Sequence, residues 1–200
     1  MAAAARRPLR QLLCWRVATK HERISLTFDD GPHATFTPQV LDILADSGAK
    51  ATFYVLGSEA ERHAALLQRA VAEGHEIGLH GYDHTHEQLP LQMERALRIV
   101  RDLGGRPLTV RPPNGRLSAG ILRWSLSRRM PLVLWSFDLE DSRRHEGKAL
   151  RRPSFAELAK GDIVLMHDDN PVCVAELPGL LRAAQEKELQ PTRVSDLLAG

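Results

Sequence analysis

The chain has 200 residues, of which 43% are apolar and 26% are charged, and its formal net charge is +2 at pH 7. This length suits one domain with a full hydrophobic core, or at most two small ones. The near-neutral charge argues against the strongly basic surface of a nucleic-acid-binding protein, and no apolar run approaches the ~18 residues that cross a bilayer. We expect a monomeric globular protein without a nucleic-acid partner.

The N-terminal segment is basic and carries a short apolar stretch. We expect a loosely docked tail over residues 1–20, followed by a single domain over residues 21–200. An alternative interpretation of this tail is a weak contact with a membrane surface through Leu12, Leu13 and Trp15.

The N-terminal segment and the two cysteines both indicate where in the cell the protein is located. Only five residues separate Arg10 from Arg16, too few for the apolar core of a secretory signal peptide. The two cysteines, Cys14 and Cys173, lie far apart and form no disulfide framework, which fits a reducing compartment. We therefore expect a cytoplasmic protein, with secretion or membrane association as the alternative.

Strand and helix patterns alternate along the chain. In chain order we expect 24–28 (strand), 37–48 (helix), 51–57 (strand), 59–73 (helix), 75–80 (strand), 88–103 (helix), 109–111 (short strand), 118–129 (helix), 131–138 (strand), 161–168 (strand), 176–188 (helix) and a closing element at 193–198. Residues 140–154 are polar and irregular, and we expect a loop there. Repeated alternation with short links predicts an α/β fold with a mainly parallel sheet.

Two aspartates stand side by side where the first predicted strand ends. Ile24, Leu26 and Phe28 alternate with polar residues up to Asp29 and Asp30. Neighbouring carboxylates in a partly buried site repel each other, and one would be driven to take up a proton. A divalent cation removes this problem by binding one carboxylate, which leaves the other free to take a proton from water. A plain turn at Asp-Asp-Gly-Pro is the alternative.

Other predicted strands also end in groups that titrate, bind metal or pair with a charge. These groups are His80 and His84, Arg111 and Asn114, Asp138 and Asp141, and His167. In parallel α/β proteins such groups meet at the carboxyl ends of the strands, so we expect one shared site. A single histidine after a buried strand, as at position 167, could also be purely structural.

Asp30, His80 and His84 form a candidate set of metal ligands. The two histidines are spaced i and i+4, which we interpret as one side of a helical turn that faces a single ion. Two nitrogens and one oxygen leave a position open for water and substrate, as a catalytic site requires. The set suits Zn²⁺, with Co²⁺ or another first-row ion as the alternative. We expect the nearby His86 to face solvent or to support the ligands.

Five short motifs occur in a fixed order within residues 24–198. They are TFDDGP (27–32), HGYDH (80–84), RPPNG (111–115), DLED (138–141) and LMH (165–167). In this order and spacing they resemble the motifs of the polysaccharide deacetylases of carbohydrate esterase family 4, also called the NodB-homology domain. The resemblance implies a distorted (β/α)7 barrel that hydrolyses N-acetyl groups, or sometimes O-acetyl groups, on sugars.

The resemblance also implies a role for each motif residue. Asp29 would be the general base that activates a metal-bound water, and Arg111 would pair with it and orient it. His167 would be the general acid that protonates the leaving amine, and Asp141 would hold it charged and oriented. Asp30 and the two histidines of the second motif would hold the metal.

The remaining implied site residues surround the acetyl group, and here the chain departs from the family. The backbone N–H of Asn114 would form part of the oxyanion site, and Trp135 and Leu165 would line the pocket for the acetyl methyl. Asn114 and Ser142 stand where the family commonly has aromatic residues, and Gly81 stands where Ser or Thr is usual. None of these changes removes a catalytic group, so we expect an active enzyme with an unusual substrate preference.

We therefore expect a metal-dependent hydrolase that removes N-acetyl groups from a GlcNAc-containing oligo- or polysaccharide, or from a glycan precursor. Three alternatives keep the fold: an O-acetyl esterase, a hydrolase of a non-sugar amide, and an inactive carbohydrate-binding domain. Arginines 143, 144, 151 and 152 flank the proposed active face. They indicate either a solvated loop or contact with an anionic substrate or surface.

Overall fold

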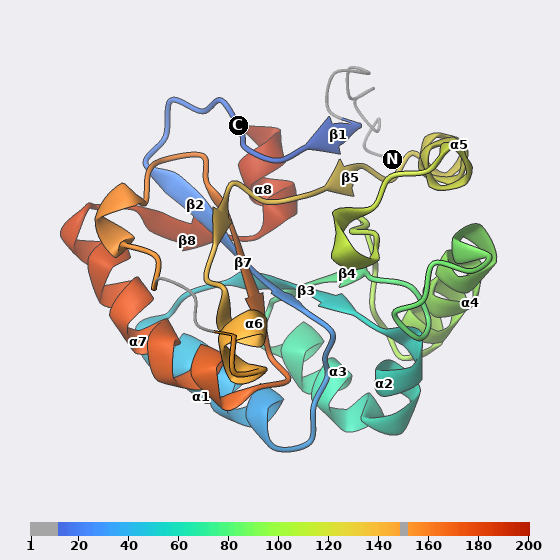
Figure 1. Ribbon diagram of the computed structural model, residues 1–200, viewed down its shortest axis with the longest axis horizontal. Helices are drawn as coiled ribbons and strands as arrows, with labels where there is room; N and C mark the ends of the chain where they lie inside the picture. Colours follow the sequence, from blue (N-terminus) through green and yellow to red (C-terminus); the bar gives the residue numbers. More distant parts are fainter. Residues whose placement is uncertain (1–11, 149–151) are drawn as a thin grey trace.

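The computed structural model describes residues 12–148 and 152–200, which form eight strands and eight α-helices (Figure 1). The strands are β1 (Leu13–Cys14), β2 (Arg23–Asp29), β3 (Ala51–Val55), β4 (Glu76–Leu79), β5 (Leu132–Val133), β6 (Phe137–Asp138), β7 (Ile163–His167) and β8 (Gln190–Thr192). The helices are α1 (Phe36–Ser47), α2 (Gly57–Arg62), α3 (Ala64–Ala72), α4 (Leu89–Asp102), α5 (Ala119–Arg128), α6 (Asp141–His145), α7 (Pro171–Glu186) and α8 (Val194–Ala199).

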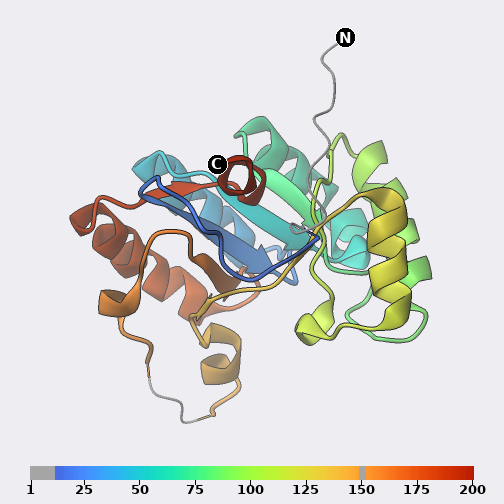
Figure 2. The same cartoon turned by 90° about the horizontal axis from the view of Figure 1, so that it is seen from above.

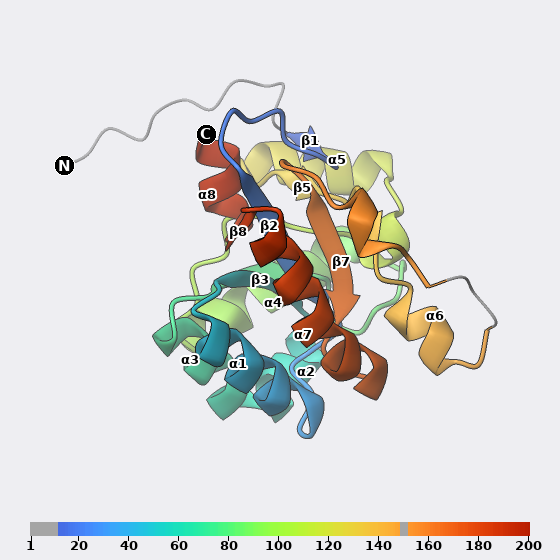
Figure 3. The same ribbon diagram turned by 90° about the vertical axis from the view of Figure 1, so that its left-hand side faces the viewer.

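The sheet is parallel throughout. Its order is β4-β3-β2-β7-β6, with β8 also paired to β2, and a second parallel pair joins β1 to β5. Helices lie outside the strands, and α7 crosses the outer face of β2 and β7 beside α1 (Figure 3). This architecture confirms the predicted α/β fold. None of the helices in the described part of the chain has the length and apolar character needed to span a bilayer.

Strand β2 is buried on both faces, and the two faces differ in chemistry. The apolar face joins the main hydrophobic core with side chains of α1 and α7, and consists of Ile24, Leu26 and Phe28. The alternate residues are polar and buried, and they are Ser25, Thr27 and Asp29. Because side chains alternate along a strand, the polar set points to the opposite side, into the barrel. One face of β2 therefore packs in the hydrophobic core. The other face directs polar side chains into the barrel and ends at Asp29, at the carboxyl end of the strand.

The barrel continues beyond β4 through a single residue. Val110 forms parallel bridges to Leu79 and to Leu132, and so links β4 to β5. Among the described residues no ladder joins β5 to β6, so the distorted barrel is open there. The segment 131–138 forms two short strands, β5 and β6, with an irregular stretch between them. The predicted continuous strand over 131–138 is therefore wrong.

The break in that predicted strand has an identifiable cause. The buried guanidinium of Arg111 donates from Nε to the carbonyl oxygen of Val133 (3.0 Å) and from Nη2 to that of Leu134 (2.9 Å). These two carbonyls are satisfied by a side chain instead of by a neighbouring strand. The chain therefore leaves the ladder between β5 and β6.

The described part of the predicted N-terminal tail is docked onto the domain. Strand β1 pairs with β5, and Arg16 forms an ion pair with Asp162 (2.7 Å). Leu12 is half-buried and Leu13 packs against the core, whereas Trp15 is exposed. Of the three residues expected to contact a membrane, only Trp15 is therefore exposed. The boundary that we expected at residue 20 therefore does not separate a loose segment from the domain, and residues 1–11 lie outside the described residues.

Several further elements differ from the prediction. The predicted helix over 59–73 is divided at His63 into α2 and α3, and the predicted strand over 109–111 is reduced to the bridges of Val110. Helix α6 lies inside the predicted loop over 140–154, and β8 was not predicted. Helix α7 begins at Pro171 instead of at 176, because Asn170 caps it by accepting the backbone N–H of Cys173 (3.0 Å). The Asn-Pro pair was the sequence signal for this earlier start.

Gly161→Ala should lower the free energy of unfolding more than Gly74→Ala does. Both glycines have left-handed φ values, 81° and 83°, but a Cβ at 161 would overlap the backbone carbonyl oxygen of Val17, whereas a Cβ at 74 meets only the end of Lys50 at 3.8 Å. We expect a loss of about 1–2 kcal/mol for the change at 74 and about 2–5 kcal/mol for the change at 161. Urea unfolding of both variants measures the difference; equal losses would show that the segment after β1 is not held against residue 161.

Candidate active site

The predicted site residues meet at the carboxyl ends of the central strands. Asp29 ends β2 and His167 ends β7, and the parallel register places these two residues side by side. Asp30 follows with a left-handed backbone (φ 73°), which directs its side chain away from the regular path of the strand. The neighbouring carboxylates therefore face different partners.

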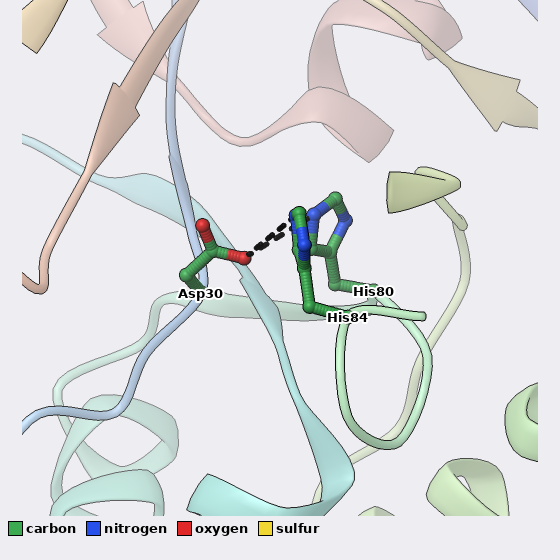
Figure 4. A group of neighbouring side chains, drawn as sticks. All are labelled: Asp30, His80 and His84. Atoms are coloured by element: carbon green, nitrogen blue, oxygen red, sulfur yellow. Dashed lines mark ion pairs between the residues drawn. The ribbon is translucent and has the colours of Figure 1, made fainter. Parts of the chain in front are cut away.

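Asp30, His80 and His84 come together as the sequence predicted (Figure 4). Their candidate ligand atoms all lie within 4.8 Å of one another. The Oδ1 atom of Asp30 is 3.4 Å from Nε2 of His80 and 3.5 Å from Nε2 of His84. This oxygen is buried and has no hydrogen-bond partner among the described residues. A cation at this point would satisfy it, so the donor set fits a metal ion.

The protonation of the two imidazoles also favours a metal, and the raised pKa of Asp30 shows that no neighbouring positive charge among the described residues offsets the burial of its carboxylate. His80 Nδ1 lies 2.8 Å from the carbonyl oxygen of Arg111, so this nitrogen carries the proton and Nε2 presents its lone pair toward Asp30. Burial lowers the pKa of His80 to about 4 and also lowers that of His84. Burial, with the charge of Asp29 second, raises the pKa of Asp30 to about 7. At neutral pH both imidazoles are therefore neutral and able to bind a cation.

The geometry behind the predicted histidine pair was nonetheless wrong. His80 follows directly after β4, and His84 lies in an irregular loop with a left-handed backbone (φ 61°) instead of on a helical turn. The rings still approach to 5.3 Å between centroids, because the loop turns back on itself. The four-residue spacing singled out two histidines that do lie together, but the helical turn that we expected between them is absent from this described loop.

Asp29 is held by a buried arginine. Arg111 Nη1 donates to Asp29 Oδ1 at 2.7 Å and to Thr27 Oγ1 at 2.8 Å, and both charged side chains are almost fully buried. With the two carbonyls between β5 and β6, the guanidinium reaches four acceptors. The pair thus has the opposite charges and hydrogen bonds that a buried ion pair requires. The second oxygen of Asp29 lies 3.7 Å from Nε2 of His80, facing the candidate metal ligands.

His167 is oriented by a buried carboxylate. Asp141 Oδ1 lies 2.9 Å from Nδ1 of His167, and its Oδ2 accepts the backbone N–H of the same residue at 2.8 Å. Burial alone would lower the pKa of His167. The hydrogen bond to Asp141, with the charges of Asp141, Asp29 and Asp30, outweighs burial and raises that pKa to about 10. The ring is therefore a proton donor held in a fixed orientation.

A cavity of about 360 Å³ opens at this end of the barrel. Eight of the predicted residues line it: Asp29, His80, His84, Asn114, Trp135, Asp138, Leu165 and His167. Arg111 and Asp141 lie behind it, in contact with Asp29 and His167. A larger groove of about 820 Å³ between α1 and α7 is lined by Gly48, Ala49, Gln190 and Pro191 near the amino ends of β3 and β8, away from these groups.

The helical form of one wall of the cavity was not predicted, although we expected Asp138 at the site and Arg143 beside it. This wall consists of α6 and the residues around it: Asp138, Glu140, Ser142, Arg143, Glu146 and Lys148. Their charges are largely paired, Arg143 with Glu140 (3.1 Å) and Lys148 with Glu146 (2.5 Å). The sequence did carry a signal, because opposite charges recur at helical spacing after Asp141.

The arginines that we expected on the active face are mostly neutralised. Arg144 Nη2 pairs with Glu176 Oε1 at 2.8 Å, and Arg152 pairs with the other oxygen of the same carboxylate. Arg151 lies outside the described residues. Because Glu176 is buried and binds both cations, these side chains tie the loop to α7 and do not form a free anion-binding group.

Sequence reasoning also missed Asp168. Its buried carboxylate accepts the hydroxyl of Thr37, and a Cβ at position 31 would collide with it. Thr37 in turn accepts the backbone N–H of His33 at 2.6 Å. Asp168 therefore supports the loop that carries Asp30. The signal was the acidic residue directly after the LMH motif, the first of the pair Asp168 and Asp169.

This arrangement at the carboxyl ends of a parallel α/β barrel is that of a NodB-type barrel protein. The chain matches the family model described as Polysaccharide deacetylase over residues 16–132. It is 32% identical over 195 residues to a peptidoglycan-N-acetylglucosamine deacetylase of Bacillus cereus, with 92% of each chain covered. The chain belongs to the polysaccharide deacetylase family, as its motifs indicated.

Two further similarities involve a longer relative and one of similar length. It is 33% identical to the peptidoglycan-N-acetylglucosamine deacetylase PgdA of Listeria monocytogenes over 90% of its own length, and it spans 40% of that relative. A solved peptidoglycan N-acetylglucosamine deacetylase in complex with 4-naphthalen-1-yl-N-oxidanyl-benzamide superposes with a TM-score of 0.82 at 25% identity, covering 94% of this chain and 93% of that one. The barrel is thus shared at full length with some relatives and is one part of others.

Proposed function

We propose that this protein is a metal-dependent deacetylase that hydrolyses the N-acetyl group of a GlcNAc-containing oligo- or polysaccharide, or of a glycan precursor. The observation that carries the proposal is the convergence of three groups on one cavity: the Asp30–His80–His84 cluster, the Asp29–Arg111 pair and the Asp141–His167 pair. Relatives named as peptidoglycan-N-acetylglucosamine deacetylases support a sugar amide as the substrate.

The metal that fits best is Zn²⁺, because two imidazole nitrogens and one carboxylate with an open position are typical of catalytic zinc sites; Co²⁺ suits the same donors. When bound, such an ion polarises the acetyl carbonyl and makes a coordinated water more acidic. Asp30, His80 and His84 would hold it.

Asp29 is the base in this proposal. Its Oδ1 is occupied by Arg111 Nη1, so Oδ2, on the side of His80, is the oxygen that takes the proton from the attacking water. The guanidinium keeps the carboxylate oriented and supplies the opposite charge before the reaction. General base catalysis of this kind contributes about 10²–10⁴-fold.

His167 is the acid. An amine leaves an amide carbon poorly unless its nitrogen is protonated, and the Asp141 carboxylate keeps the imidazole charged and fixed through Nδ1. Nε2 is then the atom that gives its proton to the departing nitrogen. His167 and Asp29 are register partners on neighbouring strands and line the same cavity, so base and acid can both reach one acetyl group bound there.

The remaining groups would bind the acetyl group itself. Leu165 lies on β7 two residues before His167, and both it and Trp135 line the cavity, where they form an apolar surface for the methyl. The backbone N–H of Asn114 would donate to the developing oxyanion. The exposed side chain of Asn114, which lies 3.3 Å from His86, would meet the sugar in place of an aromatic ring.

Metal removal and restoration test the proposal. The full chain is stripped with a chelator, reloaded with Zn²⁺, Co²⁺ or Mg²⁺, and assayed for acetate release from N-acetylglucosamine oligomers and from a matched O-acetylated xylan oligomer. We expect no release from the stripped protein, recovery with Zn²⁺ or Co²⁺ and not with Mg²⁺, and faster release from the N-acetylated oligomers. Faster release from the O-acetylated oligomer would identify an esterase, and stoichiometric Zn²⁺ binding with no release from either would identify an inactive carbohydrate-binding domain.

A further inference from the structure

Residues 103–137 contain six arginines and no acidic residue. Two of these arginines have partners, since Arg111 is buried against Asp29 and Arg128 pairs with Glu94 at 2.8 Å. The other four are exposed and form no ion pair with any described residue: Arg106, Arg116, Arg123 and Arg129. This segment therefore presents uncompensated positive charge.

The same segment exposes large apolar side chains. Leu108, Leu117, Leu122 and Leu126 are 39–49% exposed, and they are four of the six exposed large apolar residues among the described residues. Single exposed leucines are normal on a protein surface and need no explanation. Four of them within nineteen positions, interleaved with four unpaired arginines, are more than scattered single residues. Exposed apolar residues that also lie together in space mark interaction sites.

The fold gathers these residues along α5. Ile121 and Trp124 face the core, so Leu122, Arg123 and Leu126 lie on the opposite side of the helix. Helix α5 packs on α4 and lies at one edge of the molecule, and no other helix of residues 12–148 and 152–200 covers its outer side (Figures 1 and 2).

The two ends of the helix extend the same surface. Arg116 and Leu117 directly precede the N-cap Ser118, and Arg129 directly follows the last helical residue. The bridge between Val110 and Leu132 places Leu108 beside the residue after Arg129, at the C-terminal end of the helix. We call this set, from Arg106 to Arg129, the α5 face.

The chemistry of the α5 face selects among partners. The four unpaired arginines favour a partner with negative charge. The four exposed leucines favour a partner with aliphatic surface. An anionic polysaccharide lacks the aliphatic surface. The centres of protein–protein interfaces are enriched in aromatic residues, methionine and arginine, and of these the exposed part of this face offers arginine but no aromatic residue or methionine. A bilayer with anionic headgroups offers both properties, with leucines entering the interface while arginine heads stay at the phosphates.

We propose that the α5 face docks the protein onto an anionic membrane surface. This surface is distinct from the N-terminal contact expected from the sequence, whose Leu12 and Leu13 are half-buried. Arg116 follows by two residues Asn114, which lines the active-site cavity. Docking therefore brings the rim of the cavity close to the headgroups. The proposal does not depend on the proposed function, because it concerns a surface outside the cavity.

Vesicle binding by the full chain tests this proposal. Vesicles of phosphatidylcholine alone and with 30% phosphatidylglycerol serve as probes in co-sedimentation at low and high NaCl concentration. We expect binding only to the anionic vesicles, weakened by salt. Each basic residue near such a surface contributes about fivefold, so R123Q/R129Q should weaken binding about thirtyfold, and L122Q/L126Q should weaken it by about tenfold.

The matched control removes the same net charge from other helices. Arg62 on α2 and Arg182 on α7 are both exposed, so R62Q/R182Q should leave binding within about twofold of the parent. The proposal fails if R62Q/R182Q weakens binding as much as R123Q/R129Q, or if R6Q/R7Q/R10Q abolishes binding while the α5 variants retain it. It also fails if L122Q/L126Q binds like the parent, since the face would then bind polyanions in general.

Discussion

Asp29→Asn should lower kcat/KM for acetate release by about 10²–10⁴ while leaving the metal content of the protein unchanged. Asp30→Asn, one residue later, should instead remove the metal. The reason is the different direction of the two side chains: Asp29 points to Arg111, and Asp30 points to the two ligand histidines. Metal analysis after gel filtration, paired with acetate release, measures both properties on both variants.

Each variant serves as the control for the other, because both exchange a carboxylate for an amide of the same shape. The fold should survive the change at 29, since Arg111 retains Thr27 Oγ1 and two backbone carbonyls as acceptors and the amide oxygen introduced at 29 can still accept. Thermal unfolding verifies this. Full metal content with undiminished turnover for the change at 29 would contradict the assignment of Asp29 as base, and retained zinc for the change at 30 would contradict the ligand assignment.

The reacting groups were accessible to sequence reasoning because they lie where strands end. The alternation up to Phe28 predicts a strand, and the charged doublet after it indicates where the strand leaves the core. Parallel strands share one carboxyl edge, so Asp29 and His167 could be placed together without coordinates. The different directions of the Asp29 and Asp30 side chains could not be obtained in this way, because they depend on the left-handed backbone at Asp30, which a non-glycine residue seldom adopts.

Features that depend on tertiary packing were beyond the sequence. Strand propensity over 131–138 is high, yet Arg111 draws two carbonyls out of the ladder and divides the segment. The charged wall at α6 was read as a loop because polarity alone does not distinguish a short surface helix from an irregular segment. Likewise, the leucines of α5 could be placed on a helix, but only the packing against α4 shows that Leu122 and Leu126 stay uncovered.

Asp141→Asn should move the alkaline limb of the pH profile of kcat/KM to lower pH by about 1–3 units. His167 must be protonated to act as the acid, so activity is lost as pH rises through its pKa. Asp141 supplies the main interactions that raise this pKa to about 10 against burial. An amide at 141 removes the negative charge and replaces one acceptor oxygen with an NH₂ donor. This donor would face either the imidazole Nδ1–H or the backbone N–H of His167, so one of the two hydrogen bonds is lost.

Asp138→Asn is the matched control, because Asp138 belongs to the same motif and lines the cavity but has no bond to His167. It should leave the alkaline limb in place even if it alters KM. An alkaline limb unchanged by the variant at 141, or shifted equally by both variants, would remove His167 from the role of acid.

The same pair predicts how stability depends on pH. The pKa of His167 is raised from 6.5 to about 10 by folding, so the pair with Asp141 stabilises the folded state fully below pH 6.5, and this contribution is lost as pH rises toward 10. The free energy of unfolding should therefore fall more steeply between these values in the parent than in the Asp141→Asn variant. Urea unfolding of the parent and the variant at pH 6 and pH 9.5 measures this difference. Because the measurement involves no substrate turnover, it tests the electrostatic interaction of His167 with Asp141 separately from the proposed catalytic role.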